Sequence, residues 1–353
     1  MPDWTKTMTQ SFEYYTVDPA TWHDKEKIHN ITSSSINRDS SSSTLGNASF
    51  DINGTIDNDT YVRSYLVTVQ NGVRERFCLG TFLAQSPTVS FDGKVSSRTI
   101  DAYTPLIELT EKYPSLGYSI FKGANIMQTA YDICSENLRA PVVKPNSTRT
   151  LYSDFIANTS DTWLTFITDL IKNDKQYLGF DDLGRVIFCP SQSIDAMQPV
   201  WTYTSGNSSI LYPDFTIDHD LFSVPNVVTV IYSSSDLSYT VTVKNDDENS
   251  ATSIQARGRE IEYVDTSPSV LGNPTKDMID QYAKDLLKSL STVSYKLTYK
   301  HGYCPVRLGD CVRIDYPELG LNGLKAVVTT QNITCSTGCE VDETAACTKR
   351  YWG

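Results

Sequence analysis

Apolar and polar residues alternate with a period close to two over much of the chain, and the clearest case lies near the C-terminus. Val306–Ile314 and Lys325–Val328 follow this pattern, with a Gly-Asp turn in the first segment and a Gly/Asn loop, Leu319–Gly323, between the two. Such a pattern predicts a β-hairpin of a small barrel. A similar hairpin is expected from Tyr61 to Ala84, so the chain is predicted to carry one barrel element twice.

The first hundred residues predict short strands and no helix. After the polar run Ser33–Thr44, the expected strands are Ala48–Asn53, Tyr61–Val69, Val73–Phe77, Thr81–Ala84, Thr88–Phe91 and Lys94–Tyr103. Asn71-Gly72 predicts a type I′ turn, because both residues tolerate a positive φ. A turn is also expected at Gly80 and another at Asp92-Gly93. Many short strands at regular spacing are typical of an antiparallel barrel or sandwich.

The period changes between Pro105 and about Pro190. Gly123–Leu138 and Thr162–Lys172 place their apolar residues at helical spacing, which predicts two amphipathic helices. Asp161 is the expected N-cap of the second helix. Tyr177–Phe180 and Arg185–Phe188 flank a short turn and predict a hairpin, so this region is expected to be a mixed α/β module.

From about Trp201 the pattern predicts strands again. The expected strands are Ile210–Ile217, Val227–Tyr232, Tyr239–Val243 and Val293–Tyr299, with the acidic run Asp246–Ser250 as a solvated loop. One helix interrupts them, with Asn273 as its expected cap, Pro274 at its first position, and an apolar stripe from Ile279 to Leu290.

Composition and charge narrow the function. The chain has 353 residues, 21 Tyr and a formal net charge of −12, with its Lys and Arg scattered rather than grouped. This argues against specific nucleic-acid binding, which requires a basic face. The Met1–Trp4 start carries no basic and apolar leader, and no stretch approaches the roughly 18 apolar residues of a membrane span. We therefore expect synthesis in the cytosol and no membrane segment.

Seven short segments, in this order along the chain, resemble the tail hub (baseplate hub) proteins of long-tailed phages, in particular those of phages infecting Firmicutes. They are Asp3–Met8, Gly80–Phe82, Phe91–Lys94, Asp101–Leu106, Val224–Val228, Leu308–Val312 and Cys335–Cys339. The resemblance covers nearly the whole chain. No single segment is specific, and the order of the seven carries the resemblance.

The resemblance implies a mainly β fold with α+β parts: two similar small antiparallel β-barrels, an α/β module between them and a helix-containing insertion in the second barrel. The expected domains are 1–105, 106–200 and 201–353, with the insertion at about 233–300. In the family, three chains form a ring whose six barrels match the sixfold tail tube, and the other end presents a threefold surface.

The function that follows is a structural hub: a homotrimeric ring with a central channel for DNA passage, acting in the distal tail of a virion assembled in the bacterial cytoplasm. Expected partners are the tail tube and distal tail proteins, the tape measure protein, and the tail spike or fibre. The alternative is a β-rich carbohydrate-binding or host-wall adhesin module at the tail tip. A wall hydrolase is the third hypothesis, although the sequence contains no motif of such an enzyme.

Three of the five C-terminal cysteines suggest chemistry, because Cys335 and Cys339 flank a glycine turn and Cys311 lies on a predicted neighbouring strand. The five are Cys304, Cys311, Cys335, Cys339 and Cys347. A thiolate cluster for zinc or an iron–sulfur centre, buried or reduced thiols, and a disulfide formed after release from the host are the alternatives. No metal, cofactor or catalytic residue is assigned.

Other chemical candidates have ordinary structural explanations. The histidines His23, His29, His219 and His301 lie far apart, and His219 between two aspartates is interpreted as a turn residue rather than an acid or base. Asp181-Asp182 is expected in a hairpin turn. Eight glycosylation sequons are interpreted as by-products of a Ser/Thr/Asn-rich composition; they begin at Asn30, Asn47, Asn53, Asn58, Asn146, Asn158, Asn207 and Asn332.

The N-terminal segment Met1–Trp22 is unusually aromatic for a terminus. It contains Trp4, Phe12, Tyr14, Tyr15 and Trp22. Two interpretations carry equal weight: these residues cover the edge of the first barrel, or they anchor a neighbouring subunit, since aromatic residues concentrate in interface cores.

Overall fold

We describe the protein from a computed structural model, over residues 1–352 except 58, 86, 92, 95, 207–208, 219, 234–236 and 269–273. Asn58, Asp92, Asn207, His219 and Asn273, which carried sequence predictions, lie outside the described residues. The chain forms two compact units. One contains Met1–Asp214 and Tyr299–Thr344, and the other contains Phe215–Thr298 and Ala345–Gly353.

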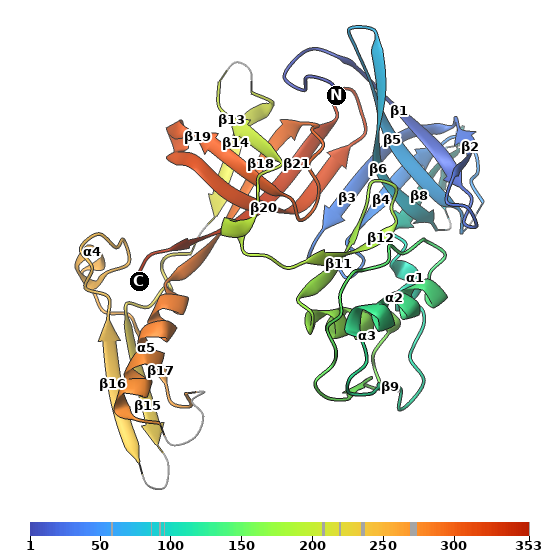
Figure 1. Cartoon of the computed structure of the whole chain (residues 1–353). Coiled ribbons are helices and arrows are strands. Elements are labelled where there is room, and N and C mark those ends of the chain that lie inside the picture. The colour runs from blue at the N-terminus through green and yellow to red at the C-terminus, as the bar shows by residue number, and fades with distance from the viewer. Residues whose placement is uncertain are drawn as a thin grey trace. The chain divides into compact units, whose positions relative to one another are not determined.

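The fold is mainly β, as predicted, and one 14-stranded sheet contains two sets of strands that we call the β-units (Figure 1). The first β-unit comprises β1 (Thr9–Val17), β2 (Asp24–Ile28), β3 (Ile31–Asp39), β4 (Gly46–Ile52), β5 (Tyr61–Gln70), β6 (Val73–Ala84), β7 (Thr88–Phe91) and β8 (Ser96–Tyr103). The second comprises β13 (Trp201–Thr204), β14 (Leu211–Asp218), β18 (Thr292–Gly302), β19 (Cys311–Tyr316), β20 (Leu321–Thr334) and β21 (Glu340–Arg350).

The two β-units repeat one strand order. The first runs β3-β4-β8-β6-β5, and the second runs β14-β18-β21-β20-β19, so strands correspond in the order in which they occur along the chain. The predicted pair of similar hairpins, β5–β6 and β19–β20, therefore occupies equivalent places, which confirms the repeat at the level of topology. One strand differs: β1 pairs antiparallel with β5, whereas β13 pairs parallel with β19.

Pairing between β3 and β20 joins the two β-units within the chain. Ser35–Asp39 of β3 lie antiparallel to Thr330–Thr334 of β20, and Ile36 lies opposite Ile333. Both isoleucine side chains are buried, so the junction is an extension of the core as well as of the hydrogen-bonded sheet.

The α/β module follows the first β-unit and has a core of its own, to which its two longer helices contribute. Its elements are α1 (Ile107–Thr110), β9 (Ser119–Ile120), α2 (Ile126–Asn137), β10 (Phe155–Ile156), α3 (Trp163–Lys172), β11 (Gln176–Phe180) and β12 (Val186–Pro190), followed by a 3-10 turn at Ile194–Ala196. The apolar stripes predicted for α2 and α3 are buried together, with Ile126, Ala130, Phe166 and Leu170 among the core residues.

The compact unit that begins at Phe215 packs one helix against a small sheet. It contains β15 (Val227–Ser233), β16 (Ser238–Lys244), α4 (Ile254–Arg257), β17 (Glu262–Asp265) and α5 (Lys276–Leu290), in the strand order β16-β15-β17. The predicted stripe of α5 is confirmed, because Ile279, Ala283 and Leu287 are buried against Val228 and Val230.

Two predicted helix caps were wrong by one or two residues. Thr162, not Asp161, caps α3 and accepts a hydrogen bond from the Thr165 amide. Thr275 caps α5, so Pro274 precedes the cap instead of occupying the first helical position. In both helices the threonine hydroxyl satisfies a free amide of the first turn, and its β-region backbone suits the cap position.

Gly80 forms a bulge rather than the predicted turn. β6 runs unbroken from Val73 to Ala84, and the register with β5 shifts where Ser64 faces Gly80 and Tyr65 faces Cys78. The φ of Gly80 is 152°, which a glycine adopts without strain and which re-aims the strand. The Asn71-Gly72 turn is confirmed, with φ values of 51° and 77°.

Several strands escaped the sequence prediction. β3 includes part of the polar run expected to precede the first strand, β1 lies in the N-terminal segment Met1–Trp22, and β2 follows that segment. In β3, Ser34 and Ile36 are buried while Ser33 and Ser35 are exposed, so serine occupies both faces and hides the alternation. No helix in the described part of the chain is long and apolar enough to cross a membrane.

Candidate functional site

The junction of the two β-units, with the side chains that hold it, is the candidate functional site. Arg38 on β3 reaches both β-units: its Nη1 donates to Oε1 of Gln331 on β20 at 2.8 Å, and its Nη2 donates to the Leu79 carbonyl on β6 at 2.7 Å. Because the guanidinium plane fixes the directions of its donors, this residue sets the spacing of three strands at once.

A polar network lies inside the second β-unit, directly behind Gln331. Glu343 on β21 is fully buried and accepts from four side chains. Its Oε1 accepts from the hydroxyls of Tyr299 at 2.6 Å and Tyr203 at 3.1 Å, and its Oε2 accepts from Nε2 of Gln331 at 2.6 Å. Nε2 of His301 lies 3.5 Å from Oε2.

The network holds a buried ion pair. His301 is also fully buried, and its Nδ1 donates to the Gly302 carbonyl at 2.8 Å. Burial lowers the pKa of His301, but the contacts with Cys304 and with the Glu343 carboxylate outweigh it and raise the pKa to about 10. Burial raises the pKa of Glu343, and His301, Tyr299 and Gln331 more than reverse this, leaving that pKa below its usual range.

A second buried charge fastens the α/β module to the first β-unit. Arg63 on β5 is 2% exposed, and its guanidinium donates to Asp24 Oδ1 at 2.8 Å, to Thr81 Oγ1 at 2.9 Å and to the Leu183 carbonyl at 3.1 Å. The same carbonyl accepts from Trp22 Nε1 at 2.9 Å and from Thr81 Oγ1 at 3.0 Å. Three donors, from Arg63, Trp22 and Thr81, therefore bind the Leu183 carbonyl and hold the turn between β11 and β12.

The turn approaches β6 so closely that its glycine has no room for a side chain. A Cβ on Gly184 would meet the Cβ of Thr81 at 2.8 Å, and Gly184 has a φ of 74°. Both the contact and the left-handed backbone favour glycine at this position.

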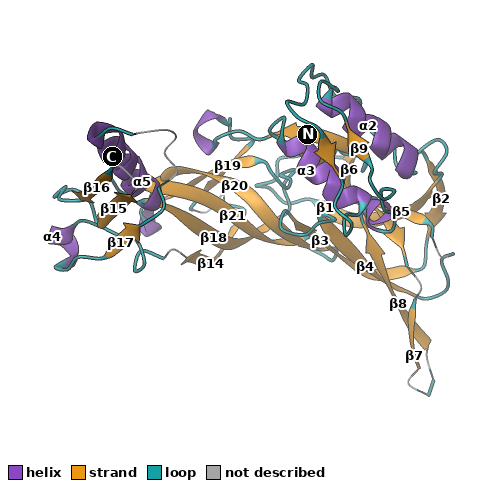
Figure 2. Ribbon diagram, turned by 90° about the horizontal axis from the view of Figure 1, so that it is seen from below, coloured by secondary structure: helices purple, strands orange, loops and turns teal. Residues whose placement is uncertain are grey.

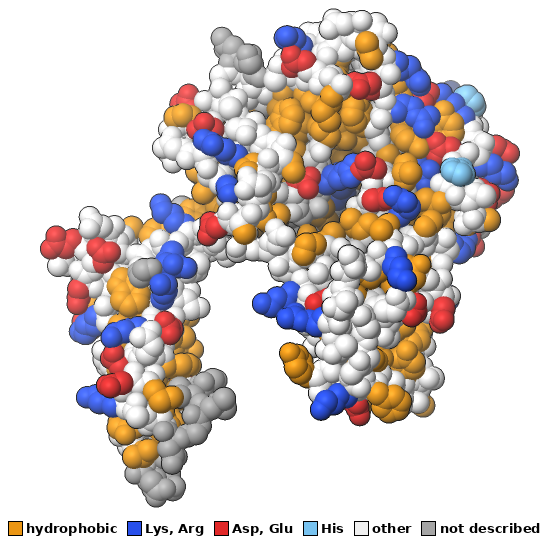
Figure 3. Space-filling model, viewed as in Figure 1, with side chains coloured by type: hydrophobic (Ala, Val, Ile, Leu, Met, Phe, Trp, Pro, Cys, Tyr) orange, Lys and Arg blue, Asp and Glu red, His pale blue; other side chains and the backbone are white. Residues whose placement is uncertain are grey.

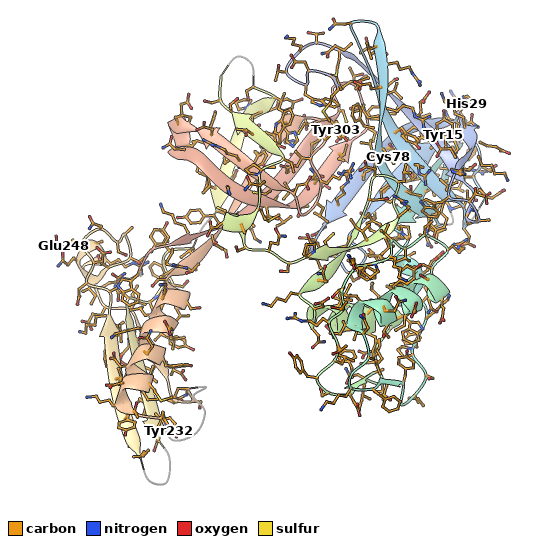
Figure 4. All side chains as sticks on the ribbon, viewed as in Figure 1. Tyr15, His29, Cys78, Tyr232, Glu248 and Tyr303 are labelled. Atoms are coloured by element: carbon orange, nitrogen blue, oxygen red, sulfur yellow. The ribbon has the colours of Figure 1, made fainter. Side chains whose placement is uncertain are left out.

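The N-terminal aromatic residues cover this chain's own sheet, which supports the first of the two interpretations. Trp4 is buried, and its ring lies edge-on to Phe77 of β6 at 5.0 Å and to Tyr303 at 5.3 Å. Trp22 packs edge-on against Tyr61 at 4.9 Å. In Figure 4, Tyr303 and Cys78, which follows Phe77, lie in this region, and His29 lies at the outer edge of the first β-unit.

A cavity of about 960 Å³ opens beside the junction, lined by parts of the first β-unit, of the α/β module and of the turn before β19. On the face seen in Figure 3, basic and hydrophobic side chains gather around a recess in the larger part of the molecule. Among its charged groups, Arg307 pairs with Asp182 and Lys172 with Asp169, and Arg38 donates to Gln331.

The cysteines do not form the cluster considered from the sequence. Cys311 opens β19 opposite Val327, whereas Cys335 and Cys339 flank the turn between β20 and β21. Burial, and then the neighbouring Cys335, raise the pKa of Cys339, and burial raises the pKa of Cys335 and of Cys347 to about 11. Within the described residues, no three His, Cys, Asp or Glu side chains are grouped to hold a metal ion.

The remaining candidates lie on the surface or in turns. His23 and His29 are exposed, whereas His301 is the buried histidine described above. Asp181 accepts from the amides of Leu183 and Arg185 at 2.9 Å each, so it serves the turn in the way expected for aspartate.

Glu343 and Arg63 were not predicted from the sequence, and His301 was interpreted as one of four histidines that lie far apart. A signal for Glu343 and His301 is present: Glu343 occupies the alternating position between Val341 and Ala345, and His301 follows Leu297 and Tyr299 on the inward face of β18. A charged residue in an apolar register position of a strand predicts a buried, partnered charge. For Arg63, no local pattern names its partners, because they lie on β2, β6 and the distant turn before β12.

No protein-family model matches the chain, and no curated protein matches it. Solved structures do. The tail protein from Neisseria meningitidis MC58 is similar with a TM-score of 0.59 at 12% identity, over 96% of this chain and 97% of that chain. The 43 kDa tail protein of prophage MuSo2 from Shewanella oneidensis is similar with a TM-score of 0.57 at 11% identity, over 95% and 97%. At these identities the chain shares with both tail proteins a fold, over almost the full length of each.

Proposed function

We propose that the protein is a structural component of a phage tail or phage-tail-like particle, namely its hub. The observation that carries this proposal is the doubled strand order, β3-β4-β8-β6-β5 and β14-β18-β21-β20-β19, in a chain that shares its full-length fold with two tail proteins. A chain with two equivalent β-units presents six of them as a trimer.

The hub acts by assembly. Three chains form a homotrimeric ring, so that six equivalent β-units meet a sixfold tail tube while the rest of each chain presents a threefold surface to the spike or fibre. The polar contacts described above suit this task, because Arg38, Arg63 and the buried Glu343–His301 pair fix the spacing of strands and module within each chain. The tube and distal tail proteins and the tape measure protein are the further proposed neighbours.

The proposed ring has a central channel through which DNA passes without being held. A formal net charge of −12 favours this, because an acidic wall repels phosphates. The site holds no enzyme chemistry in this proposal, and the protein resides in the distal tail of a virion assembled in the host cytoplasm. We propose the domain division 1–105, 106–200 and 201–353, with the insertion at about 233–300.

Imaging of the particle that contains this chain tests the proposal. A Fab fragment against the chain, viewed by cryo-electron microscopy, is expected to bind at the distal end of the tail on the tube axis, and quantitative mass spectrometry is expected to give three copies per particle. Label on the tail sides or the head, or six copies per particle, contradicts the hub.

The alternative function is a carbohydrate-binding module at the tail tip, and exposed aromatic residues favour it. In the α/β module the exposed fractions of Tyr113, Phe121 and Tyr152 are 64%, 72% and 89%. Exposed aromatic rings offer flat apolar faces with a polar edge. Binding of purified host cell-wall glycan by the monomer, lost in Tyr152→Ala and retained in Leu116→Ala, supports this function in place of the hub.

A further inference from the structure

Four strands of the sheet, β2, β7, β13 and β14, have an open edge in the described part of the chain, and the repeat relates two of them. In the described part of the chain, β7 pairs with β8 and with no other strand, and β14 pairs with β18 alone. β7 and the adjoining end of β8 project beyond the neighbouring strands in Figure 2. Open edges present unpaired amides and carbonyls and are where a further strand adds.

The repeat assigns these two strands to equivalent places at the junction. In the second β-unit, Thr330–Thr334 pair with β3 and directly precede the turn into β21; in the first, Thr88–Phe91 directly precede the turn into β8. The partner strand β3 corresponds in turn to β14. β20 and β3 pair and so join the two β-units inside the chain. The strands that correspond to them, β7 and β14, do not pair with each other in the described part of the chain.

Side chains at both edges suit a partner strand. Val89 and Phe91, two residues apart on β7, are 55% and 69% exposed. Phe215 and Ile217 have the same spacing on β14, in the half that corresponds to the part of β3 paired with β20. Pro213 in β14 marks an edge strand, because a proline donates no hydrogen bond to a neighbour.

The two edges are not neighbours in the strand order of one chain. Seven steps of that order separate β14 from β7 in the described part of the sheet. The repeat gives each edge a fitting occupant, namely the equivalent strand of a second copy of this chain.

We propose that β7 of one copy pairs antiparallel with β14 of the next, in the way that β20 pairs with β3 inside each copy. This contact joins two different surfaces, so it is heterologous and closes a ring only at the correct rotation. With three such contacts between copies and three β3–β20 contacts within them, all six junctions of the ring are of one kind. This inference deepens the proposed function and rests on it.

Chemical cross-linking tests the pairing. Ser90→Cys on β7 and Thr216→Cys on β14 change exposed residues of the two edges, and a short bis-maleimide joins them if they meet. Six of the eight native cysteines are buried and two are half-buried, so the wild-type chain measures the background. The matched control carries Ser90→Cys with Glu26→Cys, which is exposed on β2, the strand at the other end of the sheet.

The purified chain with both edge cysteines is expected to give linked dimers and linked trimers and nothing larger. Their yield is expected to exceed that of the control pair on the order of tenfold, because a specific contact raises the effective concentration of the two thiols. A mixture of the two single variants is expected to give the linked dimer alone.

The outcomes separate the two proposals. A trimer, measured by sedimentation, that gives no more link than the control pair overturns the strand pairing and leaves the hub standing. Linked chains that grow beyond three support the pairing and contradict the threefold ring. A chain that neither associates nor links overturns the pairing, while the hub is decided separately by the position and copy number in the particle.

Discussion

The two β-units share a strand order but differ in what fills them. The interior of the first is apolar around Phe50, Leu66 and Ile100. The interior of the second encloses Glu343 and His301 with their hydrogen-bond partners. The same topology therefore accepts an apolar core in one place and a charged core in the other, where the buried charges have hydrogen-bond partners.

The difference also shows where each β-unit is held. In the first β-unit, Arg63 binds the Leu183 carbonyl of the neighbouring α/β module. In the second β-unit, Glu343 lies in the interior and accepts from Gln331, which also contacts Arg38. We infer that the Glu343 network stiffens the junction strand β20 rather than binding a ligand. Buried networks of this kind rigidify when every member is satisfied.

The largest expected effect comes from breaking the charged core. Glu343→Ala leaves the His301 cation and two tyrosine hydroxyls buried without their acceptor, and it is expected to cost about 3–5 kcal/mol of unfolding free energy. Native-state hydrogen exchange of the β18 and β21 amides measures this loss of stability locally. If the two charges matter only as a pair, the double variant Glu343→Leu with His301→Leu is expected to recover most of the lost unfolding free energy.

Glu340→Ala is the control for this change. Glu340 lies on the same strand, is half exposed, and pairs with Lys300 on the surface. Such pairs contribute about 0–1 kcal/mol. If Glu343→Ala costs no more than Glu340→Ala, the second β-unit does not depend on its buried charge and the comparison fails.

Arg63→Met tests the external clamp and is expected to cost about 2–3 kcal/mol, because a buried, charge-assisted set of hydrogen bonds is lost while Trp22 and Thr81 still serve the Leu183 carbonyl. Limited proteolysis is expected to cut the α/β module sooner and the second β-unit at an unchanged rate. Arg185→Met, at a half-exposed ion pair of the same turn, serves as the control. Equal cleavage of both variants would show that Arg63 does not hold the module.

The second β-unit is also expected to lose stability in alkali. The pKa of His301 rises from 6.5 to about 10 on folding, so its contribution is complete below pH 6.5 and is lost as the pH rises towards 10. The slope is up to about 1.4 kcal/mol per pH unit in that window. Urea midpoints between pH 6.5 and 9.5 measure it; His301→Gln should flatten the slope, and His29→Gln, at an exposed site, should preserve it.

Local patterns in the sequence were enough to predict much of the fold. The Asn71-Gly72 turn, the helical stripes of α2, α3 and α5, and the two similar hairpins all follow from spacing along a short segment. The strands β2 and β3 were missed because charged residues or serines occupy both of their faces, so that backbone pairing rather than apolar alternation determines them. β1, which contains Phe12, Tyr14 and Tyr15, was interpreted only as an aromatic terminus.

The site was harder to predict, since its contacts join distant positions. The Arg38–Gln331 hydrogen bond spans 293 residues and the Trp22–Leu183 hydrogen bond spans 161. Glu343 is the instructive case, because its place in the alternation of β21 predicts burial but cannot name Tyr203, His301 or Gln331 as the partners that make burial tolerable.

The smallest expected effect concerns the two equivalent hairpins, whose turns differ. β5–β6 turns tightly at Asn71-Gly72, whereas β19–β20 turns through a 3-10 segment, Pro317–Leu319, that ends at Gly320. Asn71→Ala forces a side chain without a local hydrogen bond into a φ of 51° and is expected to cost about 1 kcal/mol, and Asn71→Gly almost nothing. Urea midpoints measure both. Strand pairing and the β3–β20 junction define the shared strand order, so neither variant should alter the trimer. Loss of association in Asn71→Gly would show that the tip of the β5–β6 hairpin, and not the open edge at β7, carries the contact between copies.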